Sequence, residues 1–481
     1  MECGNLMRKD DMQNRYSYLV KNTGILAISN FSSKILAFLL VPLYTRVLTT
    51  EEYGSYDLIS ITIQLLIPIF TVNICEAVVR YLMDKNIEEN DVITIGAKYC
   101  CIGLLLFIVV AICNRITNLV PLLNNYVIMT IALFFSTVLY QYTSSIAKGL
   151  EKVTCIAVAG IISTVVMIFG NIVLLLYFKL GIIGFFLSSI LSQLIPAVIL
   201  FSKMNVWGRI NRDSAKHVQI SMTKYSAPLI LNSVGWWMNN ALDRYAVTFI
   251  CGAAVNGIFS VAYKIPTILA TVQQIFIQAW QISAIKEYSN DSKHFYGEMM
   301  NFINMTMGIT CMSLIVTTKL LARFLYANEF YQAWKYVPFL LVSGVMNSVS
   351  GVLGPILCAD KNSKTLGKST FYGAGVNVVL NITLVYSIGP QGAAIATLIS
   401  SFAIYLLRDR ALIGKIDQST KNKMLVSWIL LTIQASIMIY CESYSLQVIV
   451  IIIYLSLYCR ELKKICYIAG SCLSKYLHSS K

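Results

Sequence analysis

The sequence has few charged residues for its length. Only 13% of its 481 residues are Asp, Glu, Lys or Arg, against 57% hydrophobic residues and a mean hydropathy of +0.67. A single soluble core cannot hide that much apolar surface, so most of it must face lipid. Charge is absent from 116–147, 153–178 and 180–202, and each run exceeds the roughly 20 residues that a membrane-spanning helix needs. We therefore predict an all-α integral membrane protein, since unpaired backbone groups are too costly in lipid.

Signatures of metal sites and membrane-embedded enzymes are also missing. The three histidines, His217, His294 and His478, lie outside the apolar runs, and the thirteen cysteines include no C-x-x-C pair. We expect no metal site, no disulfide and no cofactor. The absence of a D-x-D motif and of a long outer loop argues against a polysaccharide polymerase or glycosyltransferase, which stays an alternative of a different class. The polar first twenty residues, which have no cleavage site, predict a cytoplasmic tail and not a signal peptide.

The apolar runs predict about fourteen transmembrane helices, of which the first twelve form two sets of six. The expected segments are a cytoplasmic tail (1–22), an N-terminal six-helix bundle (23–202), a cytoplasmic linker (203–221), a C-terminal six-helix bundle (222–407), a cytoplasmic loop (408–424), an extra transmembrane pair (425–459) and a basic cytoplasmic tail (460–481). Since six is even, both sets enter the membrane in the same direction. Parallel repeats of this kind are related by an axis along the membrane normal.

An internal repeat supports this division. The matched positions are Glu151 and Lys152 with Asp360 and Lys361, then 181–192 with 389–400, and Gly54 and Tyr56 with Gly257 and Phe259, at offsets of 209, 208 and 203. Such duplication is typical of membrane carriers. The charged residues do not repeat, because at an offset of 203 Lys34 falls opposite Trp237 and Lys264 falls opposite Ile61. We therefore predict two similar halves around an asymmetric polar path.

The distribution of cations predicts the orientation. If the N-terminus is cytoplasmic, 29 of the 38 Lys and Arg lie at the inner side and 6 at the outer side, with Lys34, Arg244 and Lys264 inside spans. This is a strong positive-inside signal, so both termini of a multi-pass membrane protein are expected in the cytoplasm. The net charge of +15 then matches anionic lipid headgroups and predicts no nucleic-acid partner.

Polar side chains recur at helical spacing in the predicted eighth span. They follow one another at steps of three and four residues, and they are Lys264, Thr267, Thr271, Gln274, Gln278 and Gln281. Such spacing places them on one helix face, which is expected to line water or a polar partner. Polar contacts that join helices are the alternative.

Other spans add charged and aromatic residues. Asn232, Trp236, Asn239 and Asp243 share a face of the seventh span, with Arg244 beside them. We predict mainly cationic sites along a central cavity, because Arg and Lys suit phosphate, while Trp and amide groups suit sugars. The alternative is mutual neutralisation, of Glu76 by Arg80 and of Asp243 by Arg244 or Lys264. The candidate substrate contacts are Lys34, Arg80, Trp236, Asn240, Asp243, Arg244, Lys264, Gln274 and Gln278, and the candidates for ion coupling are Glu76 and Asp243.

Four segments resemble a known family. SNFSSKILAFLLVPLYTRVLTTEEYG (29–54), EAVVRY (76–81), LDRY (242–245) and GIFSVAYKIP (257–266) resemble the bacterial polysaccharide or O-antigen flippases of the multidrug/oligosaccharidyl-lipid/polysaccharide exporter superfamily. The resemblance covers essentially the whole chain. It implies two six-helix bundles around a central cavity, alternating access, and a cargo of oligosaccharide on undecaprenyl diphosphate, for O-antigen of lipopolysaccharide, capsule or exopolysaccharide. It also implies membrane lipids, and polysaccharide polymerase or chain-length machinery, as partners of a monomer.

The drug-exporting branch of that superfamily is the nearest alternative. Its members commonly carry an acidic ion-coupling residue in the first span, whereas 23–46 contain neither Asp nor Glu. This favours the lipid-linked sugar branch. If the extra pair 425–459 matches that of fourteen-span members, the resemblance implies that it packs against the lipid tail of the carrier.

Overall fold

The computed structural model describes residues 38–84, 86–118, 120–211, 215–286, 293–359, 363–412, 414 and 416–463, and all regular structure in them is helical. The chain forms two compact units. Unit 1 contains the residues up to Ala241 together with Leu325–Asn328, and unit 2 contains Leu242–Phe324 and the residues from Glu329 onward. The boundary falls inside a helix, and the division into bundles 23–202 and 222–407 stays a prediction.

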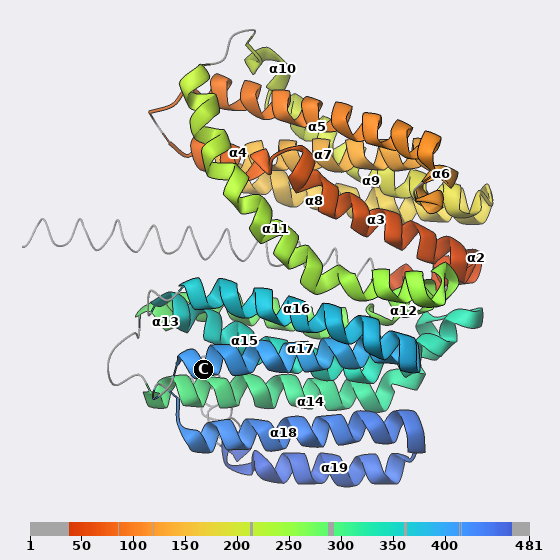
Figure 1. Ribbon diagram of the computed structural model, residues 1–481, viewed down its shortest axis with the longest axis vertical. Helices are drawn as coiled ribbons and strands as arrows, with labels where there is room; N and C mark the ends of the chain where they lie inside the picture. Colours follow the sequence, from red (N-terminus) through yellow and green to blue (C-terminus); the bar gives the residue numbers. More distant parts are fainter. Residues whose placement is uncertain are drawn as a thin grey trace, which may run out of the picture. The chain divides into compact units, whose positions relative to one another are not determined.

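Unit 1 is a bundle of antiparallel helices. Its elements are α2 (Val41–Val47), α3 (Thr50–Phe70), α4 (Ile74–Leu82), α5 (Glu89–Thr117), α6 (Pro121–Asn125), α7 (Val127–Gly149), α8 (Val153–Asn171) with a π-helical extension η1 (Ile172–Tyr177), α9 (Gly181–Lys203), α10 (Val206–Arg209) and most of α11 (Lys216–Cys251). Figure 1 shows α5, α7 and α9 running side by side. A capping box starts α3, where Glu52 N donates to Thr49 Oγ1 and Thr49 N donates to Glu52 Oε2 at 2.8 Å.

Unit 2 is also a helical bundle, with α15 at its centre. Its elements are the end of α11, α12 (Ala253–Ala262), α13 (Pro266–Lys286), α14 (Lys293–Leu325), the 3₁₀-helix η2 (Asn328–Lys335), α15 (Val337–Ala359), α16 (Ser363–Ile388), α17 (Pro390–Ala411), α18 (Gln418–Ser436) with a π-helical extension η3 (Ile437–Cys441), and α19 (Tyr444–Leu457). The helix α15 packs against α13, α16, α17 and α18. Figure 1 shows α18 and α19 lying together along one edge of the unit.

The structure confirms the all-α membrane class. Among the residues it describes, ten helices are long and apolar enough to cross a membrane, or eleven if α12 and the first part of α13 form one bent span. The apolar helix α19 is shorter than these. Most of the first predicted span, 23–46, lies outside the described residues, so a total of fourteen spans stays a prediction.

Two predicted spans are interrupted in the structure. The second breaks between α3 and α4, where Val72 and Asn73 have φ of 54° and 50° and Asn73 N donates to Pro68 O at 2.8 Å. The eighth bends by 47° between α12 and α13, because Pro266 lacks an N–H group and its ring restricts the residue before it. Membrane proteins tolerate such breaks where the backbone is buried in protein or lines a cavity.

The bend at Pro266 corrects the prediction that one helix face carries the polar stripe of the eighth span. Lys264 lies in the turn before α13, so it does not share one straight helix with Thr267, Thr271 and the glutamines that follow. In the second span, Asn73 is the left-handed residue that precedes α4, the helix that carries Glu76 and Arg80.

Candidate functional site

Asp243 and Arg244 meet the same tyrosine in unit 2. Asp243, on α11, is 4% exposed and accepts hydrogen bonds from Tyr263 Oη and, at 2.9 Å, from Arg244 N. The Arg244 guanidinium carbon lies 4.9 Å from the centroid of the Tyr263 ring, within the range of a cation–π interaction. Tyr263 belongs to the turn that Pro266 creates. The bend between α12 and α13 therefore places this tyrosine against α11.

Buried amides extend this arrangement into α16 and α17. The Tyr263 hydroxyl also interacts with the side chain of Thr397, and Asn377 Nδ2 lies 3.5 Å from Thr397 Oγ1 and 3.3 Å from Ser400 Oγ. Asn381 Nδ2 donates to Asn377 Oδ1 at 2.8 Å. Both asparagines are buried. We use the name Asp243 cluster for the six residues of this connected polar chain, which are Asp243, Arg244, Tyr263, Thr397, Asn377 and Asn381.

Four members of the Asp243 cluster are not among the residues predicted from the sequence. They are Tyr263, Thr397, Asn377 and Asn381, although the two asparagines stand four residues apart in an apolar run. That spacing places both amides on one helix face, and a buried amide in a membrane helix needs a polar partner. The four-residue spacing could therefore have identified Asn377 and Asn381 from the sequence. Tyr263 had no comparable signal, because tyrosine is common in apolar runs.

Lys264 follows the cluster directly and is partly exposed. Beyond it, Thr267 Oγ1 donates to Lys264 O at 2.5 Å and Thr271 Oγ1 donates to Thr267 O at 2.7 Å. These hydroxyls are therefore satisfied by the backbone, and Thr271 is buried. Gln274 is exposed. Of the predicted stripe, Lys264 and Gln274 remain the described side chains best placed to reach a ligand.

Glu76 and Arg80 lie together on α4 in unit 1. Both are exposed, and the ion pairs within the described part of the chain do not include a Glu76–Arg80 pair. The predicted alternative of mutual neutralisation thus finds no support in their positions. Nearby, Asn73 Nδ2 donates to Ser233 Oγ at 3.2 Å and Trp237 Nε1 donates to Ile61 O at 2.7 Å, so polar groups of α11 also serve as helix contacts.

Several candidate contacts lie outside the described residues. They are Lys34, whose whole segment is not described, and the side chains of Trp236, Asn240 and Gln278. Their part in a site stays a prediction.

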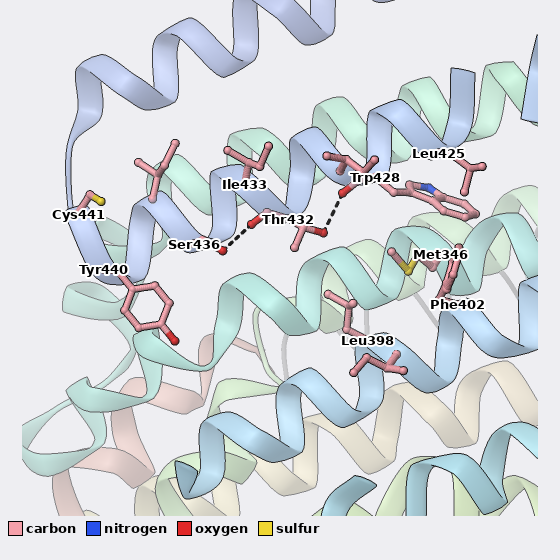
Figure 2. A pocket seen from close by; sticks show the side chains of 13 residues that line it. Met346, Leu398, Phe402, Leu425, Trp428, Thr432, Ile433, Ser436, Tyr440 and Cys441 are labelled. Atoms are coloured by element: carbon pink, nitrogen blue, oxygen red, sulfur yellow. Dashed lines mark hydrogen bonds between the residues drawn. The ribbon is translucent and has the colours of Figure 1, made fainter. Parts of the chain in front are cut away.

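An apolar groove opens between α15, α17 and α18 in unit 2. It has a volume of about 670 Å³ and is lined by Met346, Leu398, Ile399, Phe402, Leu425, Trp428, Ile429, Thr432, Ile433, Ser436, Ile437, Tyr440 and Cys441. Figure 2 shows that Thr432 and Ser436 bond within their own helix, to Trp428 O at 2.8 Å and Thr432 O at 2.9 Å. The Trp428 indole N–H donates to Asn304 Oδ1 at 2.8 Å. The groove therefore presents an almost wholly apolar surface.

Buried hydrogen bonds fix α18 and α19 to α14. Asn304, on α14, is fully buried, and its Nδ2 donates to Ser427 Oγ at 2.7 Å and to Tyr458 Oη at 2.6 Å. Its backbone carbonyl accepts from Tyr454 Oη at 3.0 Å, and Lys319 forms an ion pair with Glu442. The terminal pair is thus an integral part of unit 2.

Comparison with known proteins identifies the family. Residues 19–281, more than half of the chain, match the model of a family described as polysaccharide biosynthesis protein. The chain belongs to this family. It is also 22% identical over 411 residues to an uncharacterised membrane protein of Methanocaldococcus jannaschii. The aligned region covers 81% of this chain and 96% of that relative.

Solved structures show the fold that this family member shares. The lipid II flippase MurJ, in an inward closed conformation, superposes with a TM-score of 0.67 at 16% identity, over 91% of this chain and 99% of that one. A multidrug resistance MATE family transporter, in an inward-facing conformation, superposes with a TM-score of 0.59 at 12% identity. The superposition covers 82% of this chain and 99% of that transporter. The chain therefore has the multi-pass helical membrane fold of these two transporters.

The family match covers only part of the candidate site. Asp243, Arg244, Tyr263 and Lys264 fall within residues 19–281, whereas the groove and the asparagines of α16 fall beyond them. The matched range therefore includes the charged end of the Asp243 cluster and not its asparagines.

Proposed function

We propose that this transporter translocates undecaprenyl-diphosphate-linked oligosaccharide units across the cytoplasmic membrane by alternating access, for O-antigen, capsule or exopolysaccharide synthesis. The observation that carries the proposal is the pairing of two unlike surfaces in unit 2. One is polar and cationic, around Arg244 and Lys264, and the other is the apolar groove. An amphiphilic cargo with a charged head and a hydrocarbon tail needs both.

The cations are proposed to hold the diphosphate. Arg244 offers several N–H donors and Lys264 a point charge, which together suit phosphate oxygens. Arg80, which is exposed in unit 1, and Lys34 are proposed as further contacts to the phosphates. Trp236, Asn240, Gln274 and Gln278 are proposed as sugar contacts, because an aromatic face stacks on a sugar ring and amides bond to its hydroxyls.

The groove is proposed to hold part of the prenyl tail. The hydroxyls of Thr432 and Ser436 are satisfied within α18, and the Trp428 indole N–H donates to Asn304. An apolar chain against these three side chains would therefore leave none of their polar groups unpaired. Because α18 supplies much of the lining, this assigns a role to the terminal pair.

Asp243 is the stronger of the two proposed ion-coupling residues. It is buried and accepts a hydrogen bond from Tyr263, whereas Glu76 is exposed. A buried carboxylate in a membrane helix is costly and is usually retained for function. Proton or cation binding at Asp243 would change its interaction with Tyr263 and hence the bend that holds Lys264.

The remaining features of the cellular role follow from the same proposal. We place the transporter in the bacterial inner membrane with both termini in the cytoplasm, as a monomer. Its proposed partners are membrane lipids and polysaccharide polymerase or chain-length machinery. The basic inner segments match the anionic surface of the cytoplasmic leaflet.

Deletion of the gene tests the proposal. Surface polysaccharide should be lost, and lipid-linked oligosaccharide should accumulate where an enzyme added outside spheroplasts cannot reach it. Loss of a polymerase would instead leave single units accessible from outside. Normal surface polymer in the deletion strain would contradict the proposed function.

A multidrug exporter is the second candidate, since the fold is shared with a multidrug resistance MATE family transporter. This candidate predicts that the deletion strain becomes more sensitive to cationic drugs while surface polysaccharide stays normal. Unchanged drug sensitivity together with lost polymer would exclude it.

A further inference from the structure

Two glutamine side chains are fully buried where α14, α18 and α19 pack together in unit 2. They are Gln434 on α18 and Gln447 on α19. Gln434 Nε2 donates to Met312 O of α14 at 3.3 Å, and Gln447 Nε2 donates to Met438 Sδ of η3 at 3.1 Å. Each amide nitrogen therefore has an acceptor, and these contacts fix the direction in which each amide oxygen points.

The two amide oxygens have no corresponding donor. Among the described residues, none donates a hydrogen bond to Gln434 Oε1 or to Gln447 Oε1, and both atoms are shielded from solvent. An acceptor that loses its bonds to water without gaining others destabilises the fold, so buried polar atoms in native proteins nearly always have a protein or water partner. Two such oxygens in one helix interface point to a ligand that donates hydrogen bonds to both.

The spacing of the two amides suits a single water molecule. Met438 follows Gln434 by four residues, so both side chains lie on the same face of α18 and its extension η3, about 5.4 Å apart along the axis. Gln447 contacts Met438 directly, which places its amide about one helical turn from that of Gln434. A water that donates two hydrogen bonds of about 2.8 Å joins acceptors up to about 5.6 Å apart.

A metal cation is the alternative occupant, and it fits these groups less well. Hard cations take about six or more oxygen ligands, whereas Gln434 and Gln447 offer two. Both amides are also neutral, so they would not offset the cost of a charge buried in a membrane helix bundle.

We propose that one water molecule binds between Gln434 and Gln447 and donates a hydrogen bond to each amide oxygen. The water joins α18 to α19 about two helical turns beyond the contact of Asn304 with Ser427, because seven residues separate Ser427 from Gln434. With both levels joined, the terminal pair is held to α14 as one block. This site does not depend on the cargo that the protein transports.

Radiolytic labelling in water that carries heavy oxygen tests the site. An X-ray pulse converts water into hydroxyl radicals, which oxidise nearby methionine to its sulfoxide. A bound water therefore labels a methionine that bulk solvent does not reach. Met438 is 1% exposed and contacts Gln447, and Met307 on α14, also 1% exposed, is the control. In the purified full-length protein, Met438 should be oxidised severalfold faster than Met307, and equal rates would overturn the proposal.

Removing the amides tests whether they hold the water. Gln434→Leu and Gln447→Leu should each lower the oxidation rate of Met438 to that of Met307, whereas Thr432→Val, which loses a bond only within α18, should leave it unchanged. Where a single variant unfolds, the double variant serves, because removing both amides leaves neither oxygen buried and unpaired. Oxidation of Met438 that survives the double substitution would overturn the proposal. So would oxidation that appears only after choline replaces sodium in the buffer, the result expected of a bound cation.

Discussion

A tyrosine contacts a hydroxyl of a facing helix in each unit, and in unit 2 the tyrosine also donates to the carboxylate of Asp243. In unit 1, Tyr56 Oη donates to Ser189 Oγ at 2.8 Å. In unit 2, Tyr263 interacts with Thr397, which matches Ser189 at the repeat offset of 208. Asp243 has Leu40 as its counterpart at the offset of 203. The repeat is therefore asymmetric in sequence at this position.

Removing the cations of unit 2 tests the phosphate contacts. Arg244→Ala and Lys264→Ala should each lower export about tenfold or more, since a charge-assisted hydrogen bond contributes about 1.5–3 kcal/mol. Surface polymer and the amount of inserted protein are measured together. Arg115→Ala, at the exposed end of α5, is the control and should export normally. Normal export by both unit 2 variants would return these residues to a structural role.

Neutralising Asp243 tests the coupling residue. Asp243→Asn keeps the size of the side chain but removes its charge, and export should fall by about tenfold or more if cation or proton binding there is worth about 1.4 kcal/mol or more to the cycle. Tyr56→Phe, which removes a tyrosine–serine hydrogen bond in unit 1, should change export only slightly. Both are measured as initial export rates. Similar rates for the two variants would show that Asp243 only joins helices.

At the scale of helices, the sequence predicts where spans lie better than where they break. The apolar runs predict the positions of most helices. They do not predict the break at Val72 and Asn73, because neither of these residues with positive φ is a glycine. Pro266 is a sequence signal for a bend, because a proline restricts the residue before it. The regular spacing of the polar residues around Pro266 nevertheless led to the prediction of one straight helix. The site therefore differs from prediction where the backbone departs from an ideal helix.

The Asn304 contacts should dominate the anchoring of α18 and α19. Asn304→Ala leaves Ser427, Tyr458 and the Trp428 indole without their buried partner, at a cost of about 1–3 kcal/mol for each unsatisfied group. Thermal unfolding of the purified protein should shift to clearly lower temperature. Ser436→Ala, which loses a bond only within its own helix, should unfold close to wild type. Equal midpoints would contradict the anchoring role.

Filling the groove tests the tail contact. Leu398→Trp places a large ring against α18 and should slow export of the natural cargo several-fold, with less effect on a cargo whose prenyl tail is short. Val448→Trp, on the exposed side of α19, is the control and should export normally. Equal effects of Leu398→Trp on both cargoes would contradict the assignment.

For the whole molecule, composition and periodicity predict the all-α membrane class. The candidate site depends instead on contacts between residues of different helices, which appear only in the structure. The low charge and long apolar runs are sufficient for an all-α membrane protein, and the resemblance is sufficient for its family. No pattern predicted that Asp243, Tyr263 and Asn377 would form one chain of contacts, because they come from different helices. The groove was equally hidden, since its lining is ordinary apolar sequence.

The most direct test of the account is transport by the purified protein. Proteoliposomes are loaded in one leaflet with undecaprenyl-diphosphate-linked oligosaccharide, and a membrane-impermeant glycosidase reports its arrival in the other leaflet. Wild type should translocate the lipid-linked oligosaccharide, the Arg244→Ala, Lys264→Ala double variant should not, and Arg115→Ala should translocate it normally. Translocation by wild type no faster than in protein-free liposomes, under both an applied proton gradient and an applied sodium gradient, would contradict it.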